Sequence, residues 1–196
     1  MNLIFFDTET NGLPLKWGVP FTQVNNYPRI IQFAYQVVNE KGEVIKDFKE
    51  LVKPDGWEIP NEKFWIDNGY STEINNDLGK PLFEIIEEFN EFVNLSAGII
   101  AHNMNFDANV LGAEMVRSGQ RAKVKLPKYC TMLSAIDFCG LPNPKGRGFK
   151  YLKLEELYLK LFNDTFEGAH DAGNDVEACK KCYYGLIEEG VEIVTI

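Results

Sequence analysis

The chain has 196 residues, of which 45% are hydrophobic and 13% aromatic, and its net charge is −9. This composition is typical of a globular protein with a substantial core, so we expect a single domain over residues 1–196. No apolar run approaches the roughly 20 residues of a membrane span, and the absence of a basic stretch before Asp7 argues against a signal peptide. We therefore expect a cytoplasmic protein with no membrane partner.

The first half of the chain predicts strands. Residues 2–7 form the first, in which Ile4, Phe5 and Phe6 run into Asp7, and a loop rich in glycine, proline and asparagine follows over 11–28. The stretch "RIIQFAYQVVN" alternates well enough for a second strand, with Phe33, Tyr35 and Val37 on the same face as Ile31. After the turn "EKGE", the stretch "VIKDFKELVKP" gives a third. The short connections make these three strands antiparallel neighbours.

In the second half of the chain, the spacing of apolar residues changes from that of strands to that of helices. Residues 55–80 are loop-rich, with four glycine or proline breakers. Helices are predicted for "PLFEIIEEFNEFVNL", for "NFDANVLGAEMVRSG", for "KLEELYLKLF" and for a last segment from Asp171, and a short buried strand for "GIIAHN". The helix "KLEELYLKLF" is expected to turn Leu154, Leu157, Leu161 and Phe162 inward. Strands followed by alternating helices and strands indicate an α/β domain on one mixed sheet.

The four cysteines do not indicate a disulfide framework in a chain without export signals. Cys179 and Cys182 form a CxxC pair, which could suggest zinc or redox chemistry. There is no second such pair, and neither histidine of the chain lies at zinc-finger spacing. We expect structural thiols on one face of the last helix, together with Cys130 and Cys139 elsewhere.

Basic residues gather in residues 117–153. This segment holds nine basic residues against the single acid Asp137, a net charge of +8, so the rest of the chain carries −17. The nine are Arg117, Arg121, Lys123, Lys125, Lys128, Lys145, Arg147, Lys150 and Lys153. Such asymmetry suggests a polyanionic partner on one side, and the alternative is a solvated basic face that balances an acidic one.

Acidic residues stand beside apolar anchors in three places. Asp7 and Glu9 leave the first strand on the same side, where two like charges about 5 Å apart repel by roughly 3 kcal/mol. In "HNMNFD", Asp107 falls in the first turn of a helix that follows a buried strand. In "HDAGND", His170 precedes the last helix and Asp175 follows five positions later.

Each acidic site also has a purely structural explanation. Asp107 could complement a helix dipole, Asp171 could cap its helix, and Asp7 with Glu9 could face solvent. For His102 we keep the structural interpretation. Taken together, however, the three stretches would meet where strands end and helices begin. Four carboxylates gathered there need cations, and oxygen ligands suit Mg²⁺ or Mn²⁺ rather than zinc.

The three stretches "DTETNGL", "HNMNFD" and "HDAGND", in this order, resemble the motifs of the DEDDh (DnaQ-like) 3′–5′ exonucleases. Relatives of the tyrosine type would carry Tyr at position 171, where this chain has Asp. The stretches "PRIIQFAYQVVNEKG" and "KLEELY" resemble bacterial members of the proofreading-subunit kind. The resemblance implies a ribonuclease H-like fold, a mixed five-stranded sheet flanked by helices.

The resemblance also implies roles for individual residues. The ligands of two divalent ions, Mg²⁺ or Mn²⁺, would be Asp7, Glu9, Asp107 and Asp175, with Asp7 bridging and His170 as the general base. The expected substrate contacts are Thr8, Thr10, Gly12, Leu13, Asn103, Phe106, Lys145, Arg147 and Lys150. One departure is "FWIDNGYS", which lacks a histidine that many relatives carry before a glycine there.

The implied activity is metal-dependent hydrolysis of DNA, single-stranded by preference, from its 3′ end with release of nucleoside 5′-monophosphates. An exonuclease for RNA or oligoribonucleotides is the alternative of the same chemistry. A non-catalytic module that binds nucleic-acid ends or a polymerase is the alternative of another class. Proofreading subunits usually carry a further tail, and this chain stops soon after its last predicted helix, so we expect a free-standing exonuclease, with a polymerase as an optional partner.

Overall fold

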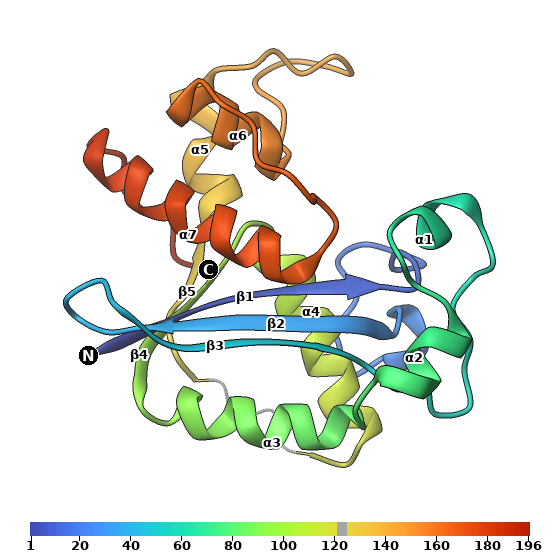
Figure 1. Cartoon of the computed structure of the whole chain (residues 1–196). Coiled ribbons are helices and arrows are strands. Elements are labelled where there is room, and N and C mark those ends of the chain that lie inside the picture. Colours follow the sequence, from blue (N-terminus) through green and yellow to red (C-terminus); the bar gives the residue numbers. More distant parts are fainter. Residues whose placement is uncertain (121–124) are drawn as a thin grey trace.

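A mixed five-stranded sheet organises the computed structural model, which describes residues 1–120 and 125–196 (Figure 1). The strand order is β3-β2-β1-β4-β5. β2 pairs antiparallel with β1 and β3, whereas β4 pairs parallel with β1 and β5, which confirms the predicted arrangement. The strands are β1 Asn2–Thr10, β2 Ile30–Val38, β3 Val44–Leu51, β4 Ser96–Ala101 and β5 Lys128–Cys130.

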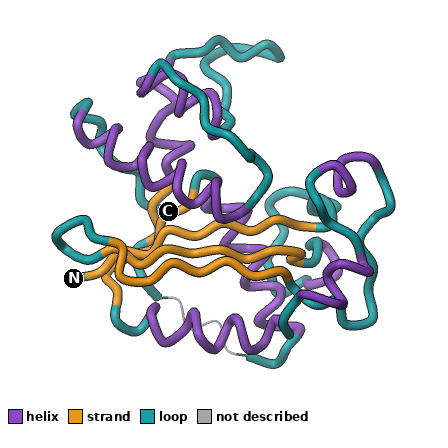
Figure 2. The backbone as a smooth tube through the Cα atoms, viewed as in Figure 1, coloured by secondary structure: helices purple, strands orange, loops and turns teal. Residues whose placement is uncertain are grey.

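Helices cover both faces of the sheet (Figures 1 and 2). The longer ones are α3 Leu82–Val93, α4 Met104–Arg117, α5 Thr131–Cys139, α6 Leu154–Phe162 and α7 Ala172–Glu188. α7 lies over one face with α5 and α6 beyond it, and α3 with α4 lies against the other. The predictions contain neither α5 nor β5, which are short elements of nine and three residues.

Successive side chains of a strand point to opposite faces of the sheet, so they pack against different helices. On β1, Ile4 and Phe6 join the core under α3 and α4, while Phe5 between them joins the core under α7. All nine residues of β2 are buried because helices cover both of its faces, and Phe33 and Tyr35 share a face as predicted. α3 completes that layer with Ile85, Ile86 and Phe89.

The loop-rich prediction for residues 55–80 is wrong in part. The segment contains two short helices, α1 Lys63–Asp67 and α2 Thr72–Leu78. A 3₁₀ turn, η1 Val24–Asn26, lies earlier, in the loop after β1. Ser71 is the N-cap of α2, and its hydroxyl accepts a hydrogen bond from the Ile74 N–H at 3.1 Å. Helices of five and seven residues are too short to leave a readable apolar period in the sequence.

Two further predictions concern single residues. The prediction that Phe162 faces inward is correct only in part: its side chain is 40% exposed where α6 ends, while its ring is tilted against the Tyr158 ring and lies beside Gly185 of α7. The cysteines agree with the structural interpretation, since Cys130, Cys179 and Cys182 are buried free thiols and Cys139 is a half-buried one. In the ranges that the structure describes, no helix has both the length and the apolarity of a membrane span.

The basic segment is divided between the two sides of the sheet. Arg117 lies on α4, where its guanidinium donates to the carbonyl oxygens of Val24, Tyr27 and Pro28. Lys153 precedes α6 in the opposite layer. Arg121 and Lys123 lie outside the described residues. The basic residues of this segment therefore do not all lie on one side, and Arg117 connects the 11–28 loop to α4.

A buried carboxylate, Glu114, adds to the contacts between α4 and the end of the 11–28 loop. One oxygen of Glu114, whose side chain is 2% exposed, accepts from Arg29 Nε at 2.7 Å, from Arg117 at 3.0 Å and from the Ile30 N–H at 3.3 Å. The contact joins α4 to the start of β2. Because the two guanidinium groups would lose their common counter-charge, removal of this carboxylate should be costly.

We expect Glu114→Ala to lower the free energy of unfolding by about 3–5 kcal/mol. Urea denaturation of the purified protein measures this. The matched control is Glu91→Ala, an exposed acid on α3, which should change stability by about 0.5 kcal/mol or less. Equal stability losses for the two variants would contradict the importance of the Glu114 contact.

Candidate active site

β1 places two acids on one side of the sheet. Asp7 pairs with Ala34 and Glu9 with Gln32 of β2, so both side chains point to the face that carries α7. The strand extends to Thr10 rather than ending at Asp7 as predicted, so both acids lie within it. Their backbone is thus fixed by sheet hydrogen bonds, and their side chains cannot separate by a loop movement.

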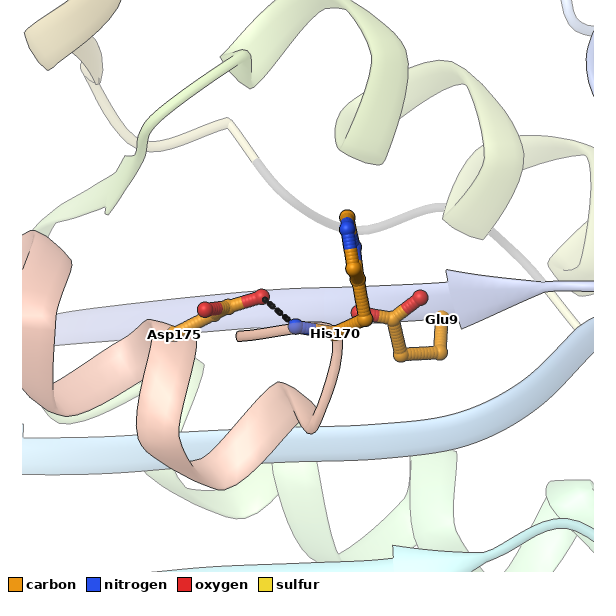
Figure 3. A group of neighbouring side chains, drawn as sticks. All are labelled: Glu9, His170 and Asp175. Carbon is orange, nitrogen blue, oxygen red and sulfur yellow. Dashed lines mark hydrogen bonds between the residues drawn. The ribbon is translucent and has the colours of Figure 1, made fainter. Parts of the chain in front are cut away.

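The start of α7 supplies the third motif. His170 has a positive φ of 70°, and its N–H donates to Asp175 Oδ2 at 3.1 Å. Figure 3 shows this bond, with Glu9 approaching from β1. The nearest ligand atoms of Glu9, His170 and Asp175 all lie within 4.8 Å of one another. Two segments more than 150 residues apart therefore meet at one point, as the sequence predicted.

Asp107 enters from the opposite layer. It occupies the first turn of α4, is only 3% exposed, and accepts a hydrogen bond from the Thr8 hydroxyl at 2.8 Å. A cavity of about 300 Å³ joins all five predicted catalytic residues. Its lining consists of Asp7, Thr8, Glu9, His102, Asn103, Phe106, Asp107, Lys153, Leu154, Glu155, His170 and Asp175.

The second histidine in the cavity wall is structural. His102 is 9% exposed, with Nδ1 at 3.0 Å from the Thr131 hydroxyl and Nε2 at 2.9 Å from the Leu152 carbonyl oxygen. Burial lowers its pKa to about 4. The neutral ring can donate from Nε2 and accept at Nδ1, so both nitrogens are satisfied and neither is available for chemistry. This agrees with the structural interpretation of His102.

The carboxylates of the cavity oppose one another's ionisation. Burial raises the pKa of Glu9 to about 8, with further increases from the charges of Asp175 and Asp107. Burial likewise raises the pKa of Asp175 to about 7 and that of Asp107 to about 7, although the Thr8 hydrogen bond opposes the shift in Asp107. For Asp7, burial and then the charges of Asp107 and Asp175 raise the pKa well above its usual value.

This arrangement fits hard divalent cations. Four carboxylates on one cavity supply only oxygen ligands, and among the described residues of the lining Lys153 is the one lysine or arginine that can offset their charge. Oxygen-rich sets of this kind suit Mg²⁺ or Mn²⁺.

Sequence reasoning missed a second set of residues, which holds the start of α7. Gln32 of β2 accepts from the Ala172 N–H at 2.7 Å and donates to Asp171 at 3.2 Å. Lys49 of β3 pairs with Asp171 at 3.1 Å. The Tyr70 hydroxyl, 3% exposed, lies 2.8 Å from both the His170 carbonyl oxygen and Gln32 Oε1. Gln32, one of two glutamines in the buried strand "IIQFAYQVV", was the signal available in the sequence.

α1 forms one wall beside the histidine. The Phe64 ring meets the His170 ring edge to face, with centroids 5.2 Å apart. The neighbouring Trp65 donates from Nε1 to the Thr10 carbonyl oxygen at 3.1 Å. Both residues belong to the stretch that departs from the family pattern.

The predicted substrate residues fall into three groups. Asn103 and Phe106 line the cavity, and Leu13 is 71% exposed beyond it. The hydroxyls of Thr8 and Thr10 are engaged internally, by Asp107 and by the Gly12 carbonyl oxygen at 2.7 Å.

Of the three predicted basic substrate contacts, two are exposed and one is engaged in an ion pair. Lys145 and Arg147 are exposed on the loop before α6, whereas Lys150 pairs with Glu156. Lys153, which lines the cavity, was noted only as a member of the basic segment.

Comparisons with known families and with known proteins both match this chain to exonucleases or to a DNA polymerase subunit. A family model described as "RNase_T: Exonuclease" matches residues 4–183. The DNA polymerase III subunit epsilon of Treponema pallidum (strain Nichols) is 31% identical over 186 residues, which cover 93% of this chain and 74% of that protein.

Solved structures share the fold at low identity. The nuclease domain of 3′hExo, described as a DEDDh family member bound to rAMP, aligns with a TM-score of 0.73 at 15% identity, over 100% of this chain and 96% of that one. E. coli exonuclease I in complex with a dT13 oligonucleotide aligns with a TM-score of 0.71 at 18% identity; the match covers 95% of this chain and 41% of that one. The predicted ribonuclease H-like fold is thereby confirmed.

The raised pKa values predict how stability depends on pH without metal. Between the ordinary carboxyl pKa near 4 and the folded values of about 7 to 8, the folded chain binds more protons than the unfolded chain, so stability must fall as pH rises. In EDTA, we expect the melting temperature to fall from pH 5 to pH 8, and Mn²⁺ to restore it at pH 8.

Asp107→Asn should raise the metal-free melting temperature at pH 8 by a few degrees, on the order of 1–3 kcal/mol, and reduce the gain from Mn²⁺. Asp77→Asn, at an exposed position of α2, is the matched control and should do neither. A metal-free melting temperature that is constant over this pH range would refute the raised pKa values of these carboxyl groups.

Proposed function

Because this chain belongs to the RNase_T exonuclease family and is a 3′–5′ exonuclease of the DEDDh type, we propose that it hydrolyses single-stranded DNA with two Mg²⁺ or Mn²⁺ ions. The products would be nucleoside 5′-monophosphates. The observation that carries the proposal is the meeting of Asp7, Glu9, Asp107, His170 and Asp175 on one cavity. The family depends on divalent metal; the identity and number of the ions are part of the proposal.

The metal ligands are proposed from the donor set. Asp7, at the centre of the repulsion from its neighbours, is the best candidate for a carboxylate shared between two ions. Glu9 and Asp175 would bind on the α7 side and Asp107 on the α4 side. When bound, such ions neutralise charge on the phosphate and lower the pKa of a coordinated water.

His170 is the proposed general base. Its ring is exposed at the mouth of the cavity beside Glu9 and Asp175, and imidazole is the side chain most often used as a general base in hydrolysis. It would take the proton from the attacking water as the new P–O bond forms. The leaving 3′ oxygen of the upstream nucleotide is then protonated, which completes the hydrolysis.

The substrate side is proposed from the cavity rim. Asn103 and Phe106 would shape the pocket of the terminal nucleotide, with Gly12 and Leu13 at its edge. Lys145, Arg147 and Lys153 would contact the upstream phosphates. Lys150 would have to exchange its ion pair with Glu156 to do so. Phosphate contacts carry little sequence information, so we propose low sequence preference.

RNA remains the second candidate substrate, because one or two contacts to a 2′-hydroxyl would decide the sugar preference. The named relatives point both ways: one is a DNA polymerase subunit and another was solved with rAMP. The relative of Treponema pallidum also makes a polymerase a proposed partner.

The main test is degradation of end-labelled DNA and RNA, single- and double-stranded, with Mg²⁺ or Mn²⁺ and with EDTA. We expect EDTA and Asp7→Asn to abolish hydrolysis, and His170→Gln to reduce kcat about 10²- to 10⁴-fold. Asp77→Asn is the matched control and should retain wild-type rates. Unchanged hydrolysis in Asp7→Asn would instead support a site elsewhere, and preference for RNA would reverse the proposed substrate.

The basic contacts predict salt dependence. KM for a single-stranded oligonucleotide should rise between about 50 and 200 mM salt, and the slope should decrease in the double variant Lys145→Ala/Arg147→Ala. Lys41→Ala, in the turn between β2 and β3, is the control. A KM that does not respond to salt would count against phosphate contacts by this loop.

A further inference from the structure

Large apolar side chains stand exposed on the loop that follows β1. Leu13 is 71% exposed, Leu15 is 80% exposed and Trp17 is 65% exposed. Isolated exposed hydrophobic residues need no explanation, but three within five positions form a patch that ordinarily marks a binding surface. The loop leaves β1 at its arrowhead in Figure 1, at the end of the strand that carries Glu9.

The backbone of this loop is held in place on both sides of the patch. Asn11 and Arg29 exchange hydrogen bonds, with the Asn11 N–H at 3.0 Å from the Arg29 carbonyl and the Arg29 N–H at 2.8 Å from Asn11 Oδ1. Asn26 bonds both to the N–H and to the carbonyl oxygen of Lys16, at 3.0 and 2.9 Å, and its own carbonyl accepts from the Leu15 N–H at 2.9 Å. The apolar side chains are therefore presented by a fixed scaffold.

The patch is continuous with the catalytic cavity. The Trp17 ring lies beside the ring of Phe106, with centroids 6.3 Å apart and planes inclined at 48°. Phe106 lines the cavity next to Asp107. An aromatic surface thus runs from the proposed scissile position outward to Trp17, and the adjacent Lys16 is exposed and positively charged.

We propose that Trp17 stacks on an unpaired base upstream of the terminal nucleotide and so extends the substrate site beyond Phe106. This subsite rests on the proposed function. Aromatic faces with a neighbouring cation are the usual elements of single-strand binding, where each stacked base strengthens binding roughly 5- to 150-fold irrespective of its identity. Bases within a duplex do not offer their faces, so the subsite favours single-stranded 3′ ends.

The test combines a protein change with a substrate change. Wild-type, Trp17→Ala and Trp17→Phe are compared on oligonucleotides of one sequence, either intact or with one abasic nucleotide at the second, third or fourth position from the 3′ end. Binding is measured by fluorescence anisotropy in EDTA, and kcat and KM are measured with Mn²⁺. The matched control is Phe83→Ala, a 49% exposed phenylalanine of α3 outside the cavity.

Trp17→Ala should raise Kd and KM about tenfold on the intact strand, with a much smaller effect on kcat. At one abasic position the wild type should lose a similar factor, and Trp17→Ala should lose little more, because the base and the ring act as one pair. Trp17→Phe should recover most of the loss. Phe83→Ala should match wild type on every substrate.

The proposal is overturned if Trp17→Ala binds the intact strand as tightly as wild type, or if abasic sites at all three positions weaken both proteins equally. The first of these results would leave the patch to a protein partner. A wild-type protein that shows these binding differences but releases no nucleotide would keep the stacking subsite and overturn the proposed function, so the two failures are distinguishable.

Discussion

Repulsion among four carboxylates is the constraint on which the rest of this structure depends. Asp7 and Glu9 are fixed by sheet hydrogen bonds, while Asp107 and Asp175 arrive on helices from opposite layers. Nothing in their side-chain contacts neutralises the group; the hydrogen bonds from Thr8 and from the His170 N–H only moderate it. The packing of the hydrophobic layers must offset this repulsion whenever cations are absent, and the folded scaffold keeps the carboxylates ready for cations.

The precision of the site comes from contacts around it. The start of α7 must hold His170 at a positive φ, which costs a residue other than glycine about 1 kcal/mol or more. Gln32, Lys49 and Tyr70 supply the compensating contacts from β2, from β3 and from the turn after α1. Strands β2 and β3 therefore contribute to the position of the His170 imidazole, although the proposed carboxylate ligands on the described strands belong to β1.

The sequence was informative where local pattern and chemistry coincide. The core strands, the long helices and the five acidic and imidazole side chains follow from apolar period and from motif spacing. Tyr70, Gln32 and Lys49 were missed because their partners lie 100 or more residues away, and hydrogen bonds over such distances leave no local signal. β5 was missed because its three residues form a strand only through pairing with β4, and Thr8 was assigned to substrate because its inward hydroxyl cannot be read from its position.

β3 is the free margin of the sheet on one side, and its composition has a consequence for self-association. The exposed row of backbone groups on such a margin invites another chain to add a strand. Here the strand alternates charged residues that reach across the layers, with Lys46 paired to Glu88 of α3 and Lys49 paired to Asp171 before α7. An incoming strand would have to break or bury these pairs, so Lys49, which also holds the start of α7 through Asp171, protects the protein against edge-to-edge aggregation.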